Sequence, residues 1–131
     1  MTPQGGSEAG ASARPRPLYP PATAASAARR RELAPDIHSA WDSFSATVFA
    51  AGALDELTKH LIAVAVAHVT QCPYCIASHT RIARIKGASD EQVMEAVWVA
   101  AEMRAGGAFA HSVIALGVLG HHEHGSEVAE G

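Results

Sequence analysis

A single proline, Pro73, lies between two helix-forming stretches and strongly constrains how this chain can fold. The stretch before it, Leu61 to Val69, is apolar on nearly every side, which is typical of a buried helix. Proline lacks a backbone N–H and clashes with the preceding turn, so this helix cannot continue through position 73. The same residue suits the first turn of a new helix, which makes Cys72 the expected N-cap. The pattern therefore predicts two consecutive helices joined at Cys72.

Hydrophobic spacing predicts further helices on both sides of this turn. One helix is expected to begin near Pro35, to carry an apolar face and to end before Gly52. Another is expected to begin near Asp55 and to contain the apolar stretch described above. The helix that begins at Pro73 is expected to end at Gly87.

The last predicted helix begins with a capping-box signature, Ser89 with Gln92. Apolar residues continue along it to Leu116, with a soft spot at residues 105–107, where the sequence is Ala-Gly-Gly. We find no strand-like alternation in the sequence, so the predicted fold class is all-α.

The two ends of the chain differ in composition from its centre. Residues 1–28 are rich in proline, glycine, serine and alanine, and we expect a flexible N-terminal tail there. Residues 29–119 are predicted to form one helical domain, and residues 120–131 a flexible, polar C-terminal tail. Three histidines of the C-terminal end, His121, His122 and His124, are interpreted as solvated.

Composition limits the partners that this chain can take. Hydrophobic residues make up 48% but aromatic residues only 5%, so the core is thin and subunits are expected to pack through small residues. The net charge of −3 gives no sign of a nucleic-acid or acidic-lipid partner. No signal segment is visible, and the longest apolar run, Leu61 to Ala67, is too short to span a bilayer. We therefore expect a cytoplasmic protein without a membrane partner or a cofactor.

Both cysteines of the chain lie at the predicted start of the third helix. Cys72, Cys75 and His79 follow one another at about one-turn spacing and share one stripe of that helix. The helix N-terminus, the neighbouring thiol and the imidazole all favour a reactive thiolate. Two cysteines in a cytosolic chain are more often redox-active, catalytic or metal-binding than a structural disulfide.

Three interpretations of this stripe remain open on the residues alone. The first is a dithiol that attacks an oxidised substrate and closes to a disulfide. The second is a zinc site, although no second cysteine pair or histidine pair has the spacing of a zinc finger. The third is a pair of buried, inert cysteines.

Other histidines are candidates for a proton relay or for packing. The turn before Pro73 can fold the third helix back on the second. At a rise of about 1.5 Å per residue, His79 then lies about 10 Å from the turn along one helix and His60 about 18 Å from it along the other. These distances leave direct contact between the two rings open and allow a relay bridged by water. His68 is interpreted as a packing residue, and His111 as either a pocket or a subunit-contact residue.

The run "LTKHLIAVAVAHVTQCPYCIASHTRIARIKGASDEQVMEAVWVAAEMRAGGAFAHS" resembles the carboxymuconolactone decarboxylase superfamily, in particular its alkylhydroperoxidase D-like branch. The resemblance covers about residues 40–118. It implies an all-α helical bundle with a Cys-x-x-Cys pair at a helix N-terminus, assembled as trimers or hexamers. It also implies that Cys75 attacks a peroxide, Cys72 donates a proton and resolves, and His79 belongs to a proton relay.

The chain departs from this branch at the start of the relay. The branch has a glutamate twelve residues before the first cysteine, and this chain has His60 there. A histidine can accept and pass a proton but supplies no fixed negative charge. Glu56, one turn earlier, is a possible substitute.

These observations predict a thiol-dependent peroxidase that reduces organic hydroperoxides through Cys72 and Cys75. The resemblance implies that an external dithiol, such as a lipoyl-bearing protein, then reduces the disulfide. The alternative is a non-catalytic module of the same fold that binds zinc or another ligand. Lactone decarboxylation is disfavoured, because the decarboxylase members of the superfamily lack the cysteine pair.

Overall fold

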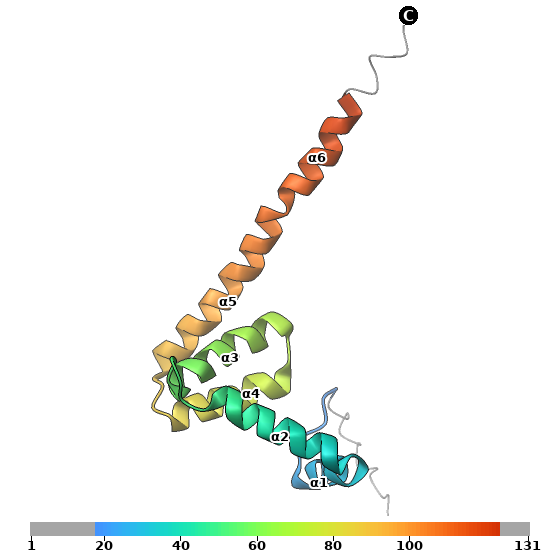
Figure 1. Cartoon of the computed structure of the whole chain (residues 1–131). Coiled ribbons are helices and arrows are strands. Elements are labelled where there is room, and N and C mark those ends of the chain that lie inside the picture. The colour runs from blue at the N-terminus through green and yellow to red at the C-terminus, as the bar shows by residue number, and fades with distance from the viewer. Residues whose placement is uncertain (1–17, 124–131) are drawn as a thin grey trace, which may run out of the picture.

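In a computed structural model, which describes residues 18–123, helices account for all the regular structure in that range. They are α1 (Ala24–Leu33), α2 (Pro35–Phe49), α3 (Glu56–Thr70), α4 (Pro73–Ile85), α5 (Asp90–Ala110) and α6 (Ser112–Glu123). The all-α class is confirmed. Figure 1 shows a compact part made of α1–α4 and the start of α5, from which α5 and α6 project as one long arm.

The helix ends follow the local signals in the sequence. Asp55 caps α3 by accepting a hydrogen bond from the Thr58 N–H at 2.6 Å. Ser89 forms the expected capping box at the start of α5. Cys72 is the N-cap of α4, as Pro73 at the first helical position predicts. Each of these ends depends on groups within four residues of one another, which is why the sequence alone is sufficient to predict them.

The core lies where α3 packs between α4 and α5. Its buried apolar side chains are small: Val64 and Ala67 from α3, Ala83 from α4 and Ala100 from α5. Small residues let helix axes approach closely, but each buries little apolar area. The described part of one chain therefore has a thin core, as the aromatic-poor composition predicts.

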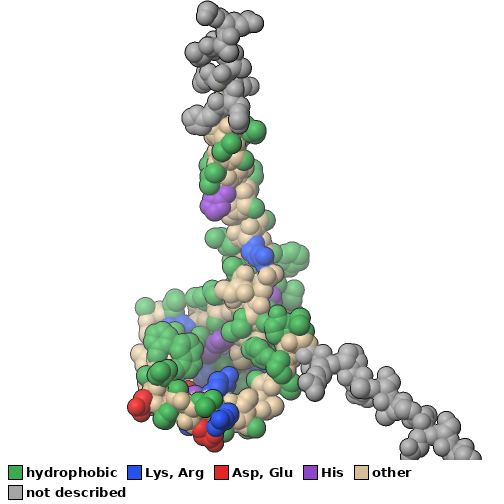
Figure 2. All heavy atoms as spheres, turned by 90° about the vertical axis from the view of Figure 1, so that its right-hand side faces the viewer, with side chains coloured by type: hydrophobic (Ala, Val, Ile, Leu, Met, Phe, Trp, Pro, Cys, Tyr) green, Lys and Arg blue, Asp and Glu red, His purple; other side chains and the backbone are tan. Residues whose placement is uncertain are grey.

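The arm formed by α5 and α6 carries large hydrophobic side chains that no other part of the described chain covers, as Figure 2 shows. The expected soft spot at residues 105–107 lies inside α5, and the helix turns only at His111. By length and composition alone, the helix over Asp90–Gly120 is long and apolar enough to cross a membrane. This segment does not stand out as an uninterrupted apolar run in the sequence, because charged residues interrupt it.

The first and last described helices extend beyond the predicted domain boundaries. Helix α1 begins at Ala24, within the segment expected as a flexible tail, and Thr23 and Ser26 form a capping box at its start. Alanine has the highest intrinsic helix propensity, and a cap adds to it. At the other end α6 extends to Glu123, past the predicted boundary at residue 119. The rest of the two expected tails, residues 1–17 and 124–131, lies outside the described residues.

Candidate active site

The N-terminus of α4 presents both thiols. Cys72 has an extended backbone, and its Sγ accepts a hydrogen bond from the Cys75 N–H at 3.3 Å. Both cysteines are free thiols and both are partly buried. A sulfur at this position takes the place of the usual N-cap oxygen, so the backbone dipoles of the first turn favour its anionic form.

The two thiols have opposite acid–base character. Hydrogen bonds from the Cys75 thiol and backbone N–H hold the pKa of Cys72 below its ordinary value. The same thiol–thiol hydrogen bond, together with burial, raises the pKa of Cys75. Of the two thiols, Cys72 therefore loses its proton more readily, and Cys75 keeps its proton to higher pH. Stripe geometry alone gives no reason to distinguish the two thiols.

Two imidazoles, one from α3 and one from α4, are in direct contact where these helices pack together. His60 of α3 and His79 of α4 lie with their Nδ1 atoms 3.1 Å apart. His60 is 5% exposed, and His79 is partly buried. The sequence left open whether the two rings touch or are bridged by water, and the structure shows a direct hydrogen bond. His79 also lies one helical turn after Cys75, on the same face of α4.

This contact limits the protonation state of the pair. Two Nδ1 atoms at hydrogen-bond distance need one proton between them, so one ring donates and the other accepts. Burial lowers the pKa of His60, and repulsion from His79 lowers it further. Burial also lowers the pKa of His79. The neutral pair holds one shared proton and an unprotonated Nε2 on the donating ring, which is the arrangement of a general base.

A phenylalanine at the end of α2 completes this cluster and was not identified from the sequence. The ring of Phe49 stacks on His60, with centroids 4.5 Å apart and planes within 8°, and lies 4.9 Å from the ring of His79. Lys59 holds this end of α2 by donating hydrogen bonds to the carbonyls of Val48, at 2.8 Å, and Ala50, at 2.5 Å. The available sequence signal was an aromatic residue at the end of the helix that precedes the loop before α3.

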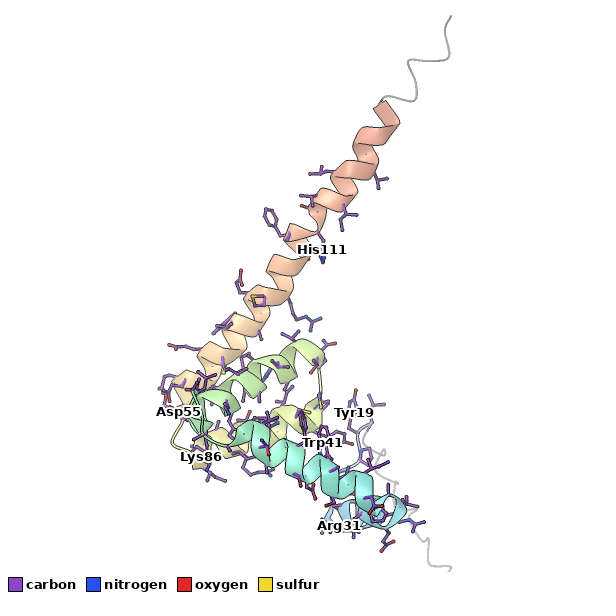
Figure 3. All side chains as sticks on the ribbon, viewed as in Figure 1. Tyr19, Arg31, Trp41, Asp55, Lys86 and His111 are labelled. Atoms are coloured by element: carbon purple, nitrogen blue, oxygen red, sulfur yellow. The ribbon has the colours of Figure 1, made fainter. Side chains whose placement is uncertain are left out.

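Other candidate residues lie elsewhere. The Glu56 carboxylate, considered as a substitute for the relay glutamate, forms an ion pair with Lys86, which holds its pKa below its ordinary value. His68 donates from Nδ1 to the carbonyl of Val64 at 2.7 Å, which fits the predicted packing role. His111 is exposed on the arm and lies far from the compact part, as Figure 3 shows, so it does not line a pocket with the cysteines.

The metal-binding alternative lacks a ligand set in the described part of the chain. Residues 18–123 contain no group of three or more histidine, cysteine, aspartate or glutamate side chains placed to hold one metal ion. The Nδ1 atoms of His60 and His79 already form a hydrogen bond with each other. A structural zinc site needs four such ligands in a tetrahedron.

Fold and site together define a small helical protein with a free cysteine pair at the N-terminus of α4 and a hydrogen-bonded imidazole pair between α3 and α4. A sequence model of the carboxymuconolactone decarboxylase family matches residues 35–117. The chain therefore belongs to the carboxymuconolactone decarboxylase family. This family includes decarboxylases and alkylhydroperoxidase D peroxidases.

Three relatives illustrate the match. A Paracoccus denitrificans protein named "Uncharacterized protein 4 in cox locus" is 64% identical over 83 residues, covering 63% of this chain and 75% of its own length. A carboxymuconolactone decarboxylase family protein of Legionella pneumophila, solved in its apo form, is 33% identical with a TM-score of 0.58, covering 60% of this chain and 70% of that one. A protein of Methanobacterium thermoautotrophicum is 31% identical with a TM-score of 0.62, covering 66% and 97%.

Proposed function

We propose that this protein is a thiol-dependent peroxidase of the alkylhydroperoxidase D-like branch, which reduces organic hydroperoxides through Cys72 and Cys75. The observation that carries the proposal is a free thiol pair on the first turn of α4, with His79 one turn further along and paired to His60. Cys75 and His79 lie one helical turn apart on α4, and His79 is hydrogen-bonded to His60, so the two imidazoles can serve as the base that an activated thiol needs.

The proposed cycle begins with loss of the proton shared by the two thiols. His79 accepts the proton of Cys75, and the Nδ1 hydrogen bond to His60 shares the resulting charge. The Cys75 thiolate attacks the terminal peroxide oxygen, so an S–O bond forms, the O–O bond breaks and the alkoxide takes a proton to leave as an alcohol. Cys72 then attacks the Cys75 sulfenic acid, releasing hydroxide that leaves as water and closing the disulfide.

An external dithiol, such as a lipoyl-bearing protein, returns the pair to the reduced state by thiol–disulfide exchange. The net reaction converts one hydroperoxide and one dithiol into an alcohol, water and an oxidised dithiol. No nucleic acid, membrane or cofactor takes part, and we place the reaction in the cytoplasm.

Which of the two thiols attacks the peroxide can be tested directly, because their pKa values are shifted in opposite directions. Cys75 is the attacking residue implied by the family resemblance, yet Cys72 carries the lower pKa. The lower pKa of Cys72 is compatible with attack by Cys75 if Cys75 first transfers its proton to Cys72 or to His79. If Cys72 attacks the peroxide first, the roles implied by the family resemblance are reversed.

The experiment is intact-mass analysis with sulfenic-acid trapping, after a small excess of an organic hydroperoxide. Wild-type protein is expected to lose both thiols together as an internal disulfide. Cys72→Ser is expected to stop at a trapped sulfenic acid on Cys75, with the matched variant Cys75→Ser reacting much more slowly. Fast trapping in Cys75→Ser alone would reverse the roles, and two free thiols in oxidant-treated wild type would refute the proposal.

The exposed apolar surface supports a homo-oligomer, which we propose to be a trimer or hexamer. Large hydrophobic side chains lie exposed along the arm, among them Trp98, Met103 and Phe109. A soluble monomer rarely exposes so much contiguous apolar surface. Light scattering coupled to size exclusion tests this: a monomer in the absence of detergent contradicts it, and a protein found only in membrane fractions would instead favour a bilayer around the arm.

A further inference from the structure

The segment before α2 lies outside the residues that define the family, yet it contacts the cysteine turn. The Tyr74 hydroxyl, from the residue between Pro73 and Cys75, donates a hydrogen bond to the Pro20 carbonyl at 2.7 Å. The Tyr19 ring packs edge-on against the Tyr74 ring, with centroids 6.2 Å apart. This N-terminal segment is thereby fixed on the start of α4, 54 residues further along the chain.

A groove of about 670 Å³ lies between this segment, α1, α2 and α4. Its walls include Pro20 and Arg30 on one side, Trp41 on another, and Cys75 and Ser78 of α4. Its volume lies within the range of about 300–1,000 Å³ that small-molecule sites occupy. Figure 3 shows Tyr19 and Trp41 on the same side of the compact part, where the N-terminal segment meets α2 and α4. Of the two thiols, Cys75 lines this groove and Cys72 does not.

The lining combines apolar walls with one cation. Prolines, an alanine, Trp41 and Tyr74 make most of the wall, and Arg30 is its one charged residue. The neighbouring Arg29 forms an ion pair with Glu32 at 3.1 Å, whereas Arg30 takes part in no ion pair within residues 18–123. A guanidinium beside apolar walls recognises a carboxylate through paired, charge-assisted hydrogen bonds.

We propose that this groove is a binding site for small amphipathic anions, and that Arg30 binds their carboxylate while the apolar chain lies along Trp41. As a substrate site the inference rests on the proposed function: its substrates are then hydroperoxides of carboxylic acids, oriented towards Cys75. The N-terminal segment, rather than the family's common helices, sets this preference. The binding itself requires no thiol chemistry, and the two statements can therefore be tested separately.

The binding test uses octanoate and 1-octanol, which share a chain length and differ in charge. In Cys72→Ser protein Cys75 is the only thiol, and its alkylation rate by iodoacetamide is followed by intact mass. Octanoate is expected to protect Cys75 saturably, with 1-octanol needing about tenfold higher concentration, as a charge-assisted hydrogen bond implies. Arg30→Gln is expected to remove this difference and Arg30→Lys to keep part of it, while Arg29→Gln retains it in full. Equal protection by the two ligands, no protection, or equal effects of Arg29→Gln and Arg30→Gln would overturn the inference.

The substrate test compares a fatty-acid hydroperoxide with its methyl ester in otherwise wild-type protein. The acid is expected to oxidise the thiol pair about tenfold faster than the ester, and Arg30→Gln to bring the ratio near one. If neither compound oxidises the thiols while octanoate still protects Cys75 through Arg30, the proposed peroxidase function fails and the anion site stands. If both oxidise the thiols at equal rates in wild type, the specificity fails and the thiol chemistry stands.

Discussion

Phe49 offers a direct test of how the imidazole pair is kept neutral. Its ring stacks on His60 and lies against His79, so it excludes water from one side of both rings. In Phe49→Ala water reaches both imidazoles, and the desolvation that lowers their pKa values decreases. We therefore expect both pKa values to rise towards the ordinary histidine value of about 6.5.

The same substitution lowers stability by an amount that burial limits. A fully buried phenylalanine replaced by alanine costs about 3–5 kcal/mol. Phe49 is only partly buried, so about half of that, near 2 kcal/mol, is expected. That cost leaves a protein of ordinary stability folded, and the titration remains measurable.

The assay is NMR titration of the imidazole C–H resonances in wild type, Phe49→Ala and Phe44→Ala. Phe44 lies on the same helix, is 59% exposed and contacts Trp41 rather than the imidazoles, so its variant controls for loss of an aromatic from α2. The acid limb of the pH–rate profile for thiol oxidation is expected to move to higher pH in Phe49→Ala only. Unchanged imidazole pKa values in folded Phe49→Ala would refute the argument that this ring keeps the pair dehydrated.

Three further outcomes follow from the described contacts. The pKa values of His60 and His79 are lowered in the folded state, so the unfolded state takes up protons first as pH falls below about 6.5. The free energy of unfolding should therefore decrease below that pH and be retained above it. In urea titrations at several pH values, His79→Asn should show a weaker dependence of this free energy on pH. Gly87→Ala meets no atom within 4 Å but places a side chain at φ +101°, so chemical denaturation should show a loss of about 1–2 kcal/mol from backbone strain alone. Ser89→Ala removes the capping box of α5 and should cost about 1 kcal/mol, with Ser89→Thr recovering most of it.

Local chemistry allowed much of the fold to be predicted from sequence. Pro73 dictated where one helix ends and the next begins, and therefore made Cys72 an N-cap. Asp55 and Ser89 marked two further helix starts through hydrogen bonds that span three residues. Such signals act over less than one helical turn, so they do not depend on how the helices pack. The helix at Ala24 was missed because composition of the whole segment outweighed a short alanine run and its cap.

The chemistry of the site depended on contacts between distant residues. Axial rise alone separated His60 from His79 by about 8 Å, yet packing of α3 on α4 brings their Nδ1 atoms to 3.1 Å. Helix crossing and side-chain reach decide such a distance, and neither is encoded in a spacing. The position of Phe49 against the pair depends in the same way on where α2 ends relative to α3.

The helical class, the thiol pair at the start of one helix and the histidine one turn later can all be predicted from the sequence. Tertiary packing is what lets the two imidazoles share a proton, gives Cys72 the lower pKa of the two thiols and forms a groove between the N-terminal segment and Cys75. The physical reason is the range of the forces involved. Helix ends are fixed by backbone hydrogen bonds between near neighbours, whereas protonation and ligand selection depend on burial, which every packed element contributes to.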